Sequence, residues 1–132
     1  MPPDLELEFD HVAIAVRALE DSLPLLERLS GTTGSPIETV ESQGVDVTFV
    51  GPVELIQPLT EEGGVARFIE KRGPGLHHIA YRVKDVASVM ERLVSEGYRF
   101  TSDAPMQGRG GHSIAFLHPG STGGVLIELV EK

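Results

Sequence analysis

Apolar and polar residues recur along the chain with two periods, one typical of strands and one typical of helices. Short runs in which apolar residues alternate or follow one another predict β-strands, and apolar residues three and four apart predict amphipathic helices. Turn-forming sequences such as SGTTGSP and HPGSTGG separate these segments. Strands are expected near residues 8–16, 35–41, 45–50, 53–58, 76–83, 98–101, 112–117 and 124–130, and helices near 19–30, 64–72 and 86–96.

The order of these segments occurs twice because the sequence contains an internal repeat. FDHVAIAV (9–16) resembles LHHIAYRV (76–83), which matches His11 with His78, 67 residues further along. VTFVGP and IAFLHP match at the same offset. After an insertion that includes STGG, VEL matches IEL, so Glu54 corresponds to Glu128.

The repeat predicts the fold class. Each copy reads strand, helix and three further strands, which is a βαβββ unit. We expect an α+β fold of two paired βαβββ repeats that form a curved mixed sheet. The first repeat spans about 8–60, the second spans about 76–131, and a linker of about 61–75 joins them within one domain over residues 1–132.

Four residues at matched positions of the repeat are candidate metal ligands: His11, Glu54, His78 and Glu128. Two imidazoles and two carboxylates suit a divalent ion in roughly octahedral geometry. Glu128 interrupts the apolar run GVLIELV, and a carboxylate buried there needs a partner. Any one of these residues alone is more often a hydrogen-bonded histidine or a solvated glutamate, but four at equivalent positions favour a metal site.

The other histidines are weaker candidates. Successive side chains of a strand point to opposite faces, so His77 is expected to face away from the side of His78. His112, beside the glycines of GRGG, and His118, before Pro119, either line the mouth of a pocket or are simply solvated. No Ser/His/Asp triad, Walker-type motif or dinucleotide-binding fingerprint is visible.

Composition narrows the choice of partners and compartment. The chain has 132 residues and a formal net charge of −9, which disfavours nucleic acid and anionic membrane surfaces. It has no run of roughly 18 apolar residues and no opening typical of a signal peptide, so a cytoplasmic protein without a membrane partner is expected. It has no cysteine, so any metal must bind to His, Asp and Glu. Arg67, Lys71 and Arg72 form either an anion-binding rim or a solvated helix face.

From about Asp10 to the C-terminus, the chain resembles the methylmalonyl-CoA epimerases of the vicinal oxygen chelate superfamily, which also holds glyoxalase I and the extradiol dioxygenases. The likeness is densest at DHVAIAV, QGV, FIEKRGPGLHHIAYRV, GGHSIAFLHP and STGGVLIELVE. The resemblance implies a paired βαβββ fold and a homodimer. It also implies a Co²⁺-type ion, with Ni²⁺, Mn²⁺ or Zn²⁺ as alternatives, at His11, Glu54, His78 and Glu128.

The same resemblance implies an activity, the interconversion of the 2R and 2S forms of methylmalonyl-CoA through a metal-stabilised enolate. Proton transfer is then expected from two carboxylates, of which Glu128 is the stronger candidate and Glu54 the weaker. The acyl-CoA substrate is expected to contact Lys71 and Arg72.

The sequence departs from the family at several positions. Some members have Gln where Glu54 stands and a base-like Glu where this chain has Val47, which cannot carry a proton. Asp46 and Glu41 are nearby alternatives, although alternation turns Asp46 to the other face. Gly120 stands where the family commonly has Lys after HP. The segment SGTTGSPIETVES matches the family poorly.

Three other functions compete with the epimerase. A glyoxalase I-like isomerase (lactoylglutathione lyase type) also uses two His and two Glu, but the epimerase motifs outside those four residues argue against it. An extradiol dioxygenase needs three protein ligands, so Glu54 as a fourth argues against that. A metal-free binding protein of the same fold, with an aromatic-lined groove, is less attractive because only 5% of the residues are aromatic, there is no Trp, and the two His and two Glu are all present.

Overall fold

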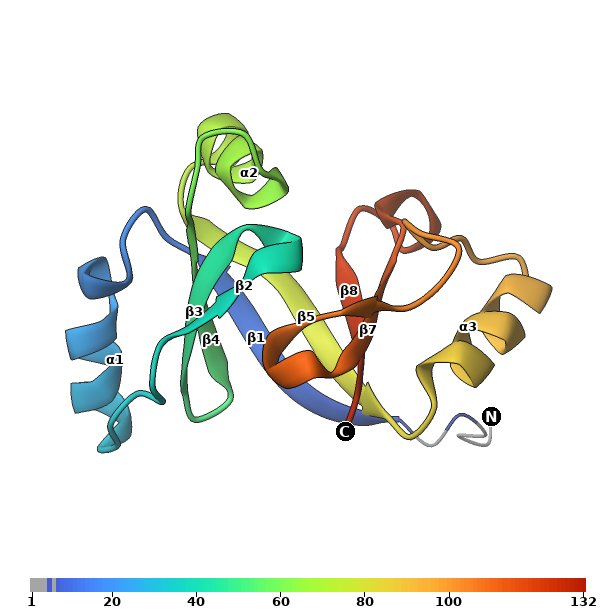
Figure 1. The fold of residues 1–132 in the computed structure, drawn as a ribbon, viewed down its shortest axis with the longest axis horizontal. Helices are drawn as coiled ribbons and strands as arrows, with labels where there is room; N and C mark the ends of the chain where they lie inside the picture. Colours follow the sequence, from blue (N-terminus) through green and yellow to red (C-terminus); the bar gives the residue numbers. More distant parts are fainter. Residues whose placement is uncertain (1–4, 6) are drawn as a thin grey trace. The chain divides into compact units, whose positions relative to one another are not determined.

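The computed structural model describes Leu5 and residues 7–132, and the chain forms two compact units. The N-terminal unit is His11–His77, and the C-terminal unit consists of the residues up to Asp10 together with His78–Lys132. Each unit carries one βαβββ repeat, with an additional helix in the N-terminal unit (Figure 1). The α+β class predicted from the sequence is therefore confirmed, and the expectation of a single domain stays a prediction.

The sheet of the N-terminal unit has the strand order β2–β3–β4–β1. Strands β1 and β4 are parallel, whereas β3 is antiparallel to both β2 and β4. The strands are β1 (Glu8–Ala15), β2 (Glu38–Val40), β3 (Val45–Val50) and β4 (Val53–Pro58), and the helices are α1 (Leu23–Ser30) and α2 (Gly64–Arg72). The turn between β3 and β4 uses Gly51 at φ 56°, a conformation that glycine adopts without steric cost.

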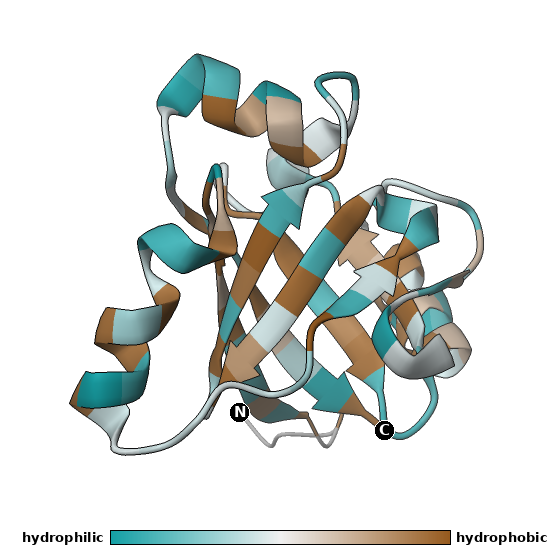
Figure 2. Ribbon diagram, turned by 60° about the vertical axis from the view of Figure 1, so that its left-hand side comes forward, coloured by the Kyte–Doolittle hydropathy of each residue, from teal (hydrophilic) through white to brown (hydrophobic). Residues whose placement is uncertain are grey.

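Two helices cover the two faces of this sheet. Alternation along the strands sends Leu55 and Val16 to the face that α1 covers, where they pack with Leu23. On the other face Val65 and Ile69 of α2 pack on buried alanine and valine side chains of the strands. Figure 2 shows the resulting hydrophobic bands along the strands, interrupted by hydrophilic positions. The face below α2 is the face that bears His11 and Glu54.

The C-terminal unit repeats the arrangement with the order β5–β8–β7–β6. Strands β5 and β8 are parallel, and β7 is antiparallel to β8 and β6. The elements are β5 (Gly75–Val83), α3 (Val86–Ser95), β6 (Met106–Gln107), β7 (Ser113–Leu117) and β8 (Ile127–Glu131). Asp85 is the N-cap of helix α3, and its carboxylate accepts a hydrogen bond from the backbone N–H of Ser88. Val86, Val89 and Met90 of this helix are buried.

Most expected elements are present, but several boundaries differ from the prediction, most clearly those of the first helix and the second strand. The helix expected at 19–30 is a short 3₁₀ turn, Leu19–Asp21, followed by α1. Pro24 has no N–H to continue helical hydrogen bonds across this point, and it sits in the first turn of α1 instead. The strand expected at 35–41 is reduced to β2, because Pro36 precedes it and a 3₁₀ turn, Glu41–Gln43, follows it.

The strand expected at 98–101 was wrong. Only Phe100 pairs there, through a single antiparallel bridge to Leu117. The edge strand is β6, in a segment that was expected to be a turn. Pro105 separates the bridge from β6, and proline cannot donate to a strand ladder.

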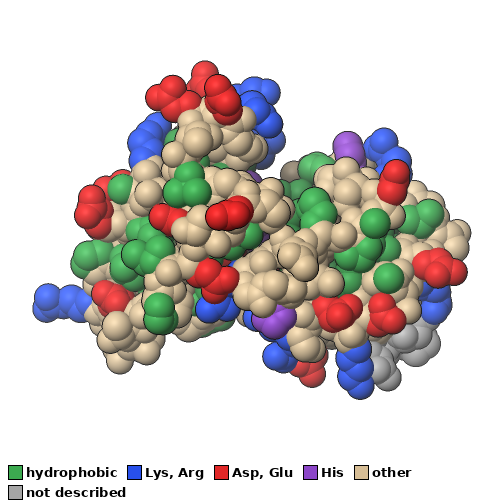
Figure 3. All heavy atoms as spheres, in the orientation of Figure 1, with side chains coloured by type: hydrophobic (Ala, Val, Ile, Leu, Met, Phe, Trp, Pro, Cys, Tyr) green, Lys and Arg blue, Asp and Glu red, His purple; other side chains and the backbone are tan. Residues whose placement is uncertain are grey.

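The surface agrees with the acidic composition. Figure 3 shows carboxylates spread over the visible face, with basic side chains beside them on α2. Among the helices of residues 5 and 7–132, none is long and apolar enough to cross a membrane.

Candidate metal centre

The N-terminal unit holds a buried histidine and glutamate side by side. Glu54 on β4 is the register partner of Ala13 on β1, and His11 lies two residues before Ala13, so alternation places both side chains on one face of the sheet. His11 Nε2 lies 3.3 Å from Glu54 Oε1. The two residues are 4% and 7% exposed, so this carboxylate is held largely away from water.

An aromatic ring supports this pair. Phe49 on β3 is the register partner of Glu54. Its ring meets the His11 imidazole edge to face, with centroids 5.0 Å apart and planes at 84°, a geometry that aromatic pairs prefer. The contact restricts rotation of the imidazole and so favours the orientation that brings Nε2 to Glu54.

The C-terminal unit contains the equivalent pair. Glu128 on β8 is the register partner of Ala80 on β5, two residues after His78. His78 Nε2 lies 3.4 Å from Glu128 Oε1, and the residues are 6% and 8% exposed. Phe116, the register partner of Glu128, meets the His78 ring at 5.4 Å and 86°. The sequence repeat is therefore accompanied in both units by the same strand register, the same burial and the same ring contact.

The two adjacent histidines of β5 have different neighbours, as alternation predicts. His78 lies beside Glu128, whereas His77 packs against Phe68 of α2, with ring centroids 4.9 Å apart. His77 is only half-buried. His77 therefore has a ring contact with α2, whereas His78 lies beside a carboxylate.

The remaining histidines have local backbone roles. His118 Nδ1 accepts the backbone N–H of Gly120 at 2.9 Å and so caps the turn Pro119–Ser121. His112 follows the turn Arg109–Gly111, and its backbone N–H donates to the Arg109 carbonyl. That either ring lines the mouth of a pocket stays a prediction.

Phe49 and Phe116 are site residues that were not singled out from the sequence. They occupy the same position in VTFVGP and IAFLHP, 67 residues apart, so the repeat itself contained the signal. A matched phenylalanine is ordinarily assigned to the core, however, and only the ring contacts with His11 and His78 connect these residues to the site.

The donor set of the two pairs fits a divalent metal. Imidazole nitrogen and carboxylate oxygen are both ligands of borderline divalent ions. Burial favours such an ion, because a buried carboxylate needs a compensating positive charge. Each unit therefore supplies one nitrogen and one oxygen ligand of the kind such an ion binds.

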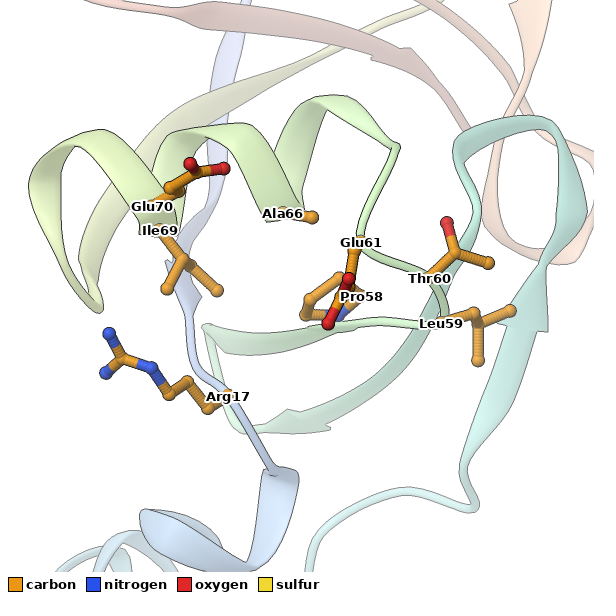
Figure 4. Close-up of a pocket in the computed structure, with 8 residues that line it drawn as sticks. All are labelled: Arg17, Pro58, Leu59, Thr60, Glu61, Ala66, Ile69 and Glu70. Atoms are coloured by element: carbon orange, nitrogen blue, oxygen red, sulfur yellow. The ribbon is translucent and has the colours of Figure 1, made fainter.

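The predicted substrate contacts Lys71 and Arg72 lie in the last turn of α2 and are exposed. The Arg72 guanidinium lies 5.5 Å from the centroid of the Phe68 ring, a cation–π contact. Neither residue lines the open cavity of about 730 Å³ in the N-terminal unit (Figure 4). That cavity lies between α2 and the end of β4 and is lined by Arg17, Pro58, Leu59, Thr60, Glu61, Ala66, Ile69 and Glu70.

Residues 10–116 match the model of the Glyoxalase/Bleomycin resistance protein/Dioxygenase superfamily. With its two βαβββ units and matched His–Glu pairs, the chain belongs to this superfamily. Within it, the chain is similar to proteins named as epimerases of acyl-CoA thioesters.

One such relative is the ethylmalonyl-CoA/methylmalonyl-CoA epimerase of Cereibacter sphaeroides, 36% identical over 126 residues that cover 91% of this chain and 94% of the relative. The uncharacterized protein YqjC of Bacillus subtilis is 40% identical over 126 residues, covering 92% and 90%. The crystal structure of methylmalonyl-CoA epimerase from Mycobacterium tuberculosis superposes with a TM-score of 0.88 at 35% identity, covering 93% of this chain and 86% of that chain.

Proposed function

We propose that this protein is an isomerase, a metal-dependent epimerase that interconverts (2R)- and (2S)-methylmalonyl-CoA. The observation that carries the proposal is the pair of buried His–Glu couples at matched positions of the two units. The names of the relatives and their near-complete coverage of the chain support an acyl-CoA as the substrate.

The proposed metal ligands are His11, Glu54, His78 and Glu128, acting on one divalent ion. Two imidazoles and two carboxylates leave positions for water or substrate oxygens in octahedral geometry. When bound, the ion would supply positive charge that stabilises the negative charge developing on the thioester oxygen. Co²⁺ is the proposed ion, with Ni²⁺, Mn²⁺ and Zn²⁺ as alternatives.

The protein's own contribution to the reaction is proton transfer. The α-hydrogen of methylmalonyl-CoA lies between a thioester and a carboxylate, so a carboxylate side chain can remove it. Inversion needs an acceptor on one face of the substrate and a donor on the other. We assign Glu128 to one of these roles and Glu54 to the other. The largely buried surroundings of both residues exclude bulk water, which would compete for the proton.

Three further assignments complete the proposal. The protein acts in the cytoplasm and as a homodimer. Lys71 and Arg72 attract the anionic groups of coenzyme A, because their charges project from an exposed helix end.

The test is exchange of the substrate's α-proton with D₂O. The metal-loaded protein, incubated with one isomer of methylmalonyl-CoA, should incorporate deuterium at the α-carbon and form the other isomer. Glu128→Gln, which keeps the shape of the side chain, should slow both processes by about 10²–10⁴-fold. If the fully metallated protein shows no exchange but isomerises a glutathione hemithioacetal, the activity is that of glyoxalase I and the proposal is wrong.

A further inference from the structure

We propose that Glu38, on the edge strand β2, is a further catalytic carboxylate that transfers a proton on one face of the substrate. This proposal rests on the epimerase function proposed above. Inversion needs two proton carriers, and Glu54 and Glu128 each lie against an imidazole as proposed ligands. In this refinement Glu38 takes the proton-transfer role given to Glu54 above, and Glu54 remains a ligand only, so that this carrier is not also a ligand.

The strand register places Glu38 on the site face. Glu38 is the partner of Val47 in the antiparallel pair of β2 and β3, and directly opposed side chains lie on the same face. Val47 is two residues before Phe49, the ring that contacts His11. Val47, Phe49 and Glu38 therefore share the face of the His11 pair. The β-carbons of such opposed residues lie about 4.5–5.5 Å apart, so the Glu38 side chain is the cross-strand neighbour of Val47 on this face.

Two other carboxylates, Asp46 and Glu41, lie in different environments. Asp46 accepts a hydrogen bond from the Thr39 hydroxyl at 2.5 Å. Thr39 and Asp46 are register partners one residue away from the pair of Glu38 and Val47, so they lie on the opposite face. Glu41 lies in the 3₁₀ turn after β2 and is exposed.

The C-terminal unit shows where a side chain at this position packs. Ile114 corresponds to Val47 in the repeat, and its partner on the edge strand is Met106. Met106 packs on the cluster that contains Ile114 and Ala80, as does Phe116, whose ring contacts His78. The side chain at this edge position therefore lies against the face that bears the His–Glu pair.

The two units differ at this position. Met106 is apolar, whereas Glu38, which occupies the same place on the other edge strand, is half-buried and ionisable. Its cross-strand partner Val47 is only 2% exposed. Inversion needs a proton carrier on each face of the substrate, and this departure from the repeat supplies an ionisable group in the N-terminal unit. In the forward direction, the α-carbon–hydrogen bond breaks and an O–H bond forms on Glu38. The electron pair moves toward the thioester oxygen, and a second carboxylic acid, that of Glu128, returns a proton to the other face.

The experiment compares Glu38→Gln with Glu41→Gln in the metal-loaded protein, using each isomer separately in D₂O. Glu38→Gln should slow interconversion of the isomers by about 10²–10⁴-fold, the range for loss of an acid–base group. The isomer whose α-hydrogen faces the remaining carboxylate should still exchange that hydrogen with retention of configuration, and the other isomer should not exchange. Glu41→Gln should match the unmodified protein in both assays.

The outcomes separate this proposal from the function on which it rests. If the unmodified protein exchanges no α-proton, the proposed function fails. If that protein is active and Glu38→Gln interconverts the isomers at the same rate, the assignment of Glu38 is overturned. It is also overturned if Glu38→Gln stops exchange of both isomers or reduces the bound metal, because Glu38 would then act on the whole site.

Discussion

Replacing His78 with alanine tests the metal centre most directly, and His77→Ala provides a matched control one residue away on β5. His78 is 6% exposed and its Nε2 lies 3.4 Å from Glu128. His77 contacts the Phe68 ring at a centroid distance of 4.9 Å. The proposed site makes His78 a ligand and leaves His77 outside the ligand set, so the two variants should differ in metal binding.

The expected magnitude follows from linkage between binding and unfolding. An ion present at 100 times its Kd stabilises the folded protein by about 2.7 kcal/mol. Loss of even a residue that only orients a ligand weakens metal binding by about 10–100-fold. If His78→Ala raises the Kd about 100-fold, the stabilisation falls to about 0.4 kcal/mol. At roughly 4 °C per kcal/mol for a chain of this size, the metal-induced rise in Tm falls from about 11 °C to about 2 °C.

His77→Ala should change stability in a different way. It removes an aromatic contact of about 0.5–1.5 kcal/mol, equally with and without metal, so the metal-induced rise in Tm should be unchanged. The assay is thermal unfolding followed by circular dichroism, with Co²⁺ and after chelation, together with the metal content of each purified variant. Equal losses of the metal-induced rise in both variants would refute the assignment of the two histidine faces.

Three further predictions concern stability and substrate binding. Leu55 is 0% exposed and packs with Leu23 on the face covered by α1. Leu55→Ala should lower the free energy of unfolding by about 2–5 kcal/mol in urea titrations, with the metal content unchanged. A loss of metal would contradict the separation of the two faces. Hydrogen bonds from the backbone N–H of Ser88, and secondly from its hydroxyl, hold the pKa of the Asp85 carboxyl below its ordinary value. The stability that this carboxylate contributes is therefore present at neutral pH and is lost as the pH falls through the lowered pKa. The Tm of the unmodified protein should exceed that of Asp85→Asn by less in acid than at neutral pH, and a constant difference would show that the charge is not involved. The double replacement of Lys71 and Arg72 by alanine should raise the KM for the acyl-CoA several-fold at low salt and less at high salt, with kcat unchanged; an unchanged KM at low salt would show that the helix end does not attract the substrate.

The internal repeat made much of the architecture predictable. The offset between LHHIAYRV and FDHVAIAV matched His11 with His78, and the later offset matched Glu54 with Glu128. Strand alternation also separated His77 from His78, and the structure gives these rings different neighbours. These features depend on spacing along the chain, which is visible in the sequence.

The edge strands were harder to predict. Strand β2 has three residues and β6 has two, which is too few to show the alternation of apolar and polar residues typical of a strand. Their length is set by backbone hydrogen bonds to β3 and β7 and by Pro36 and Pro105 beside them. For this reason the strand expected at 98–101 is only a bridge at Phe100.

The sequence by itself determined which residues correspond between the two repeats, because correspondence follows from order and spacing. Only the tertiary structure decided which side chains meet. Phe49 approaches His11, and Glu38 shares its face, because hydrogen bonds across β2, β3 and β4 fix a register between segments separated by turns. A one-residue change in that register would turn Glu38 away from the site and bring Thr39 in its place, and the pattern of apolar residues in so short a strand does not select between the two.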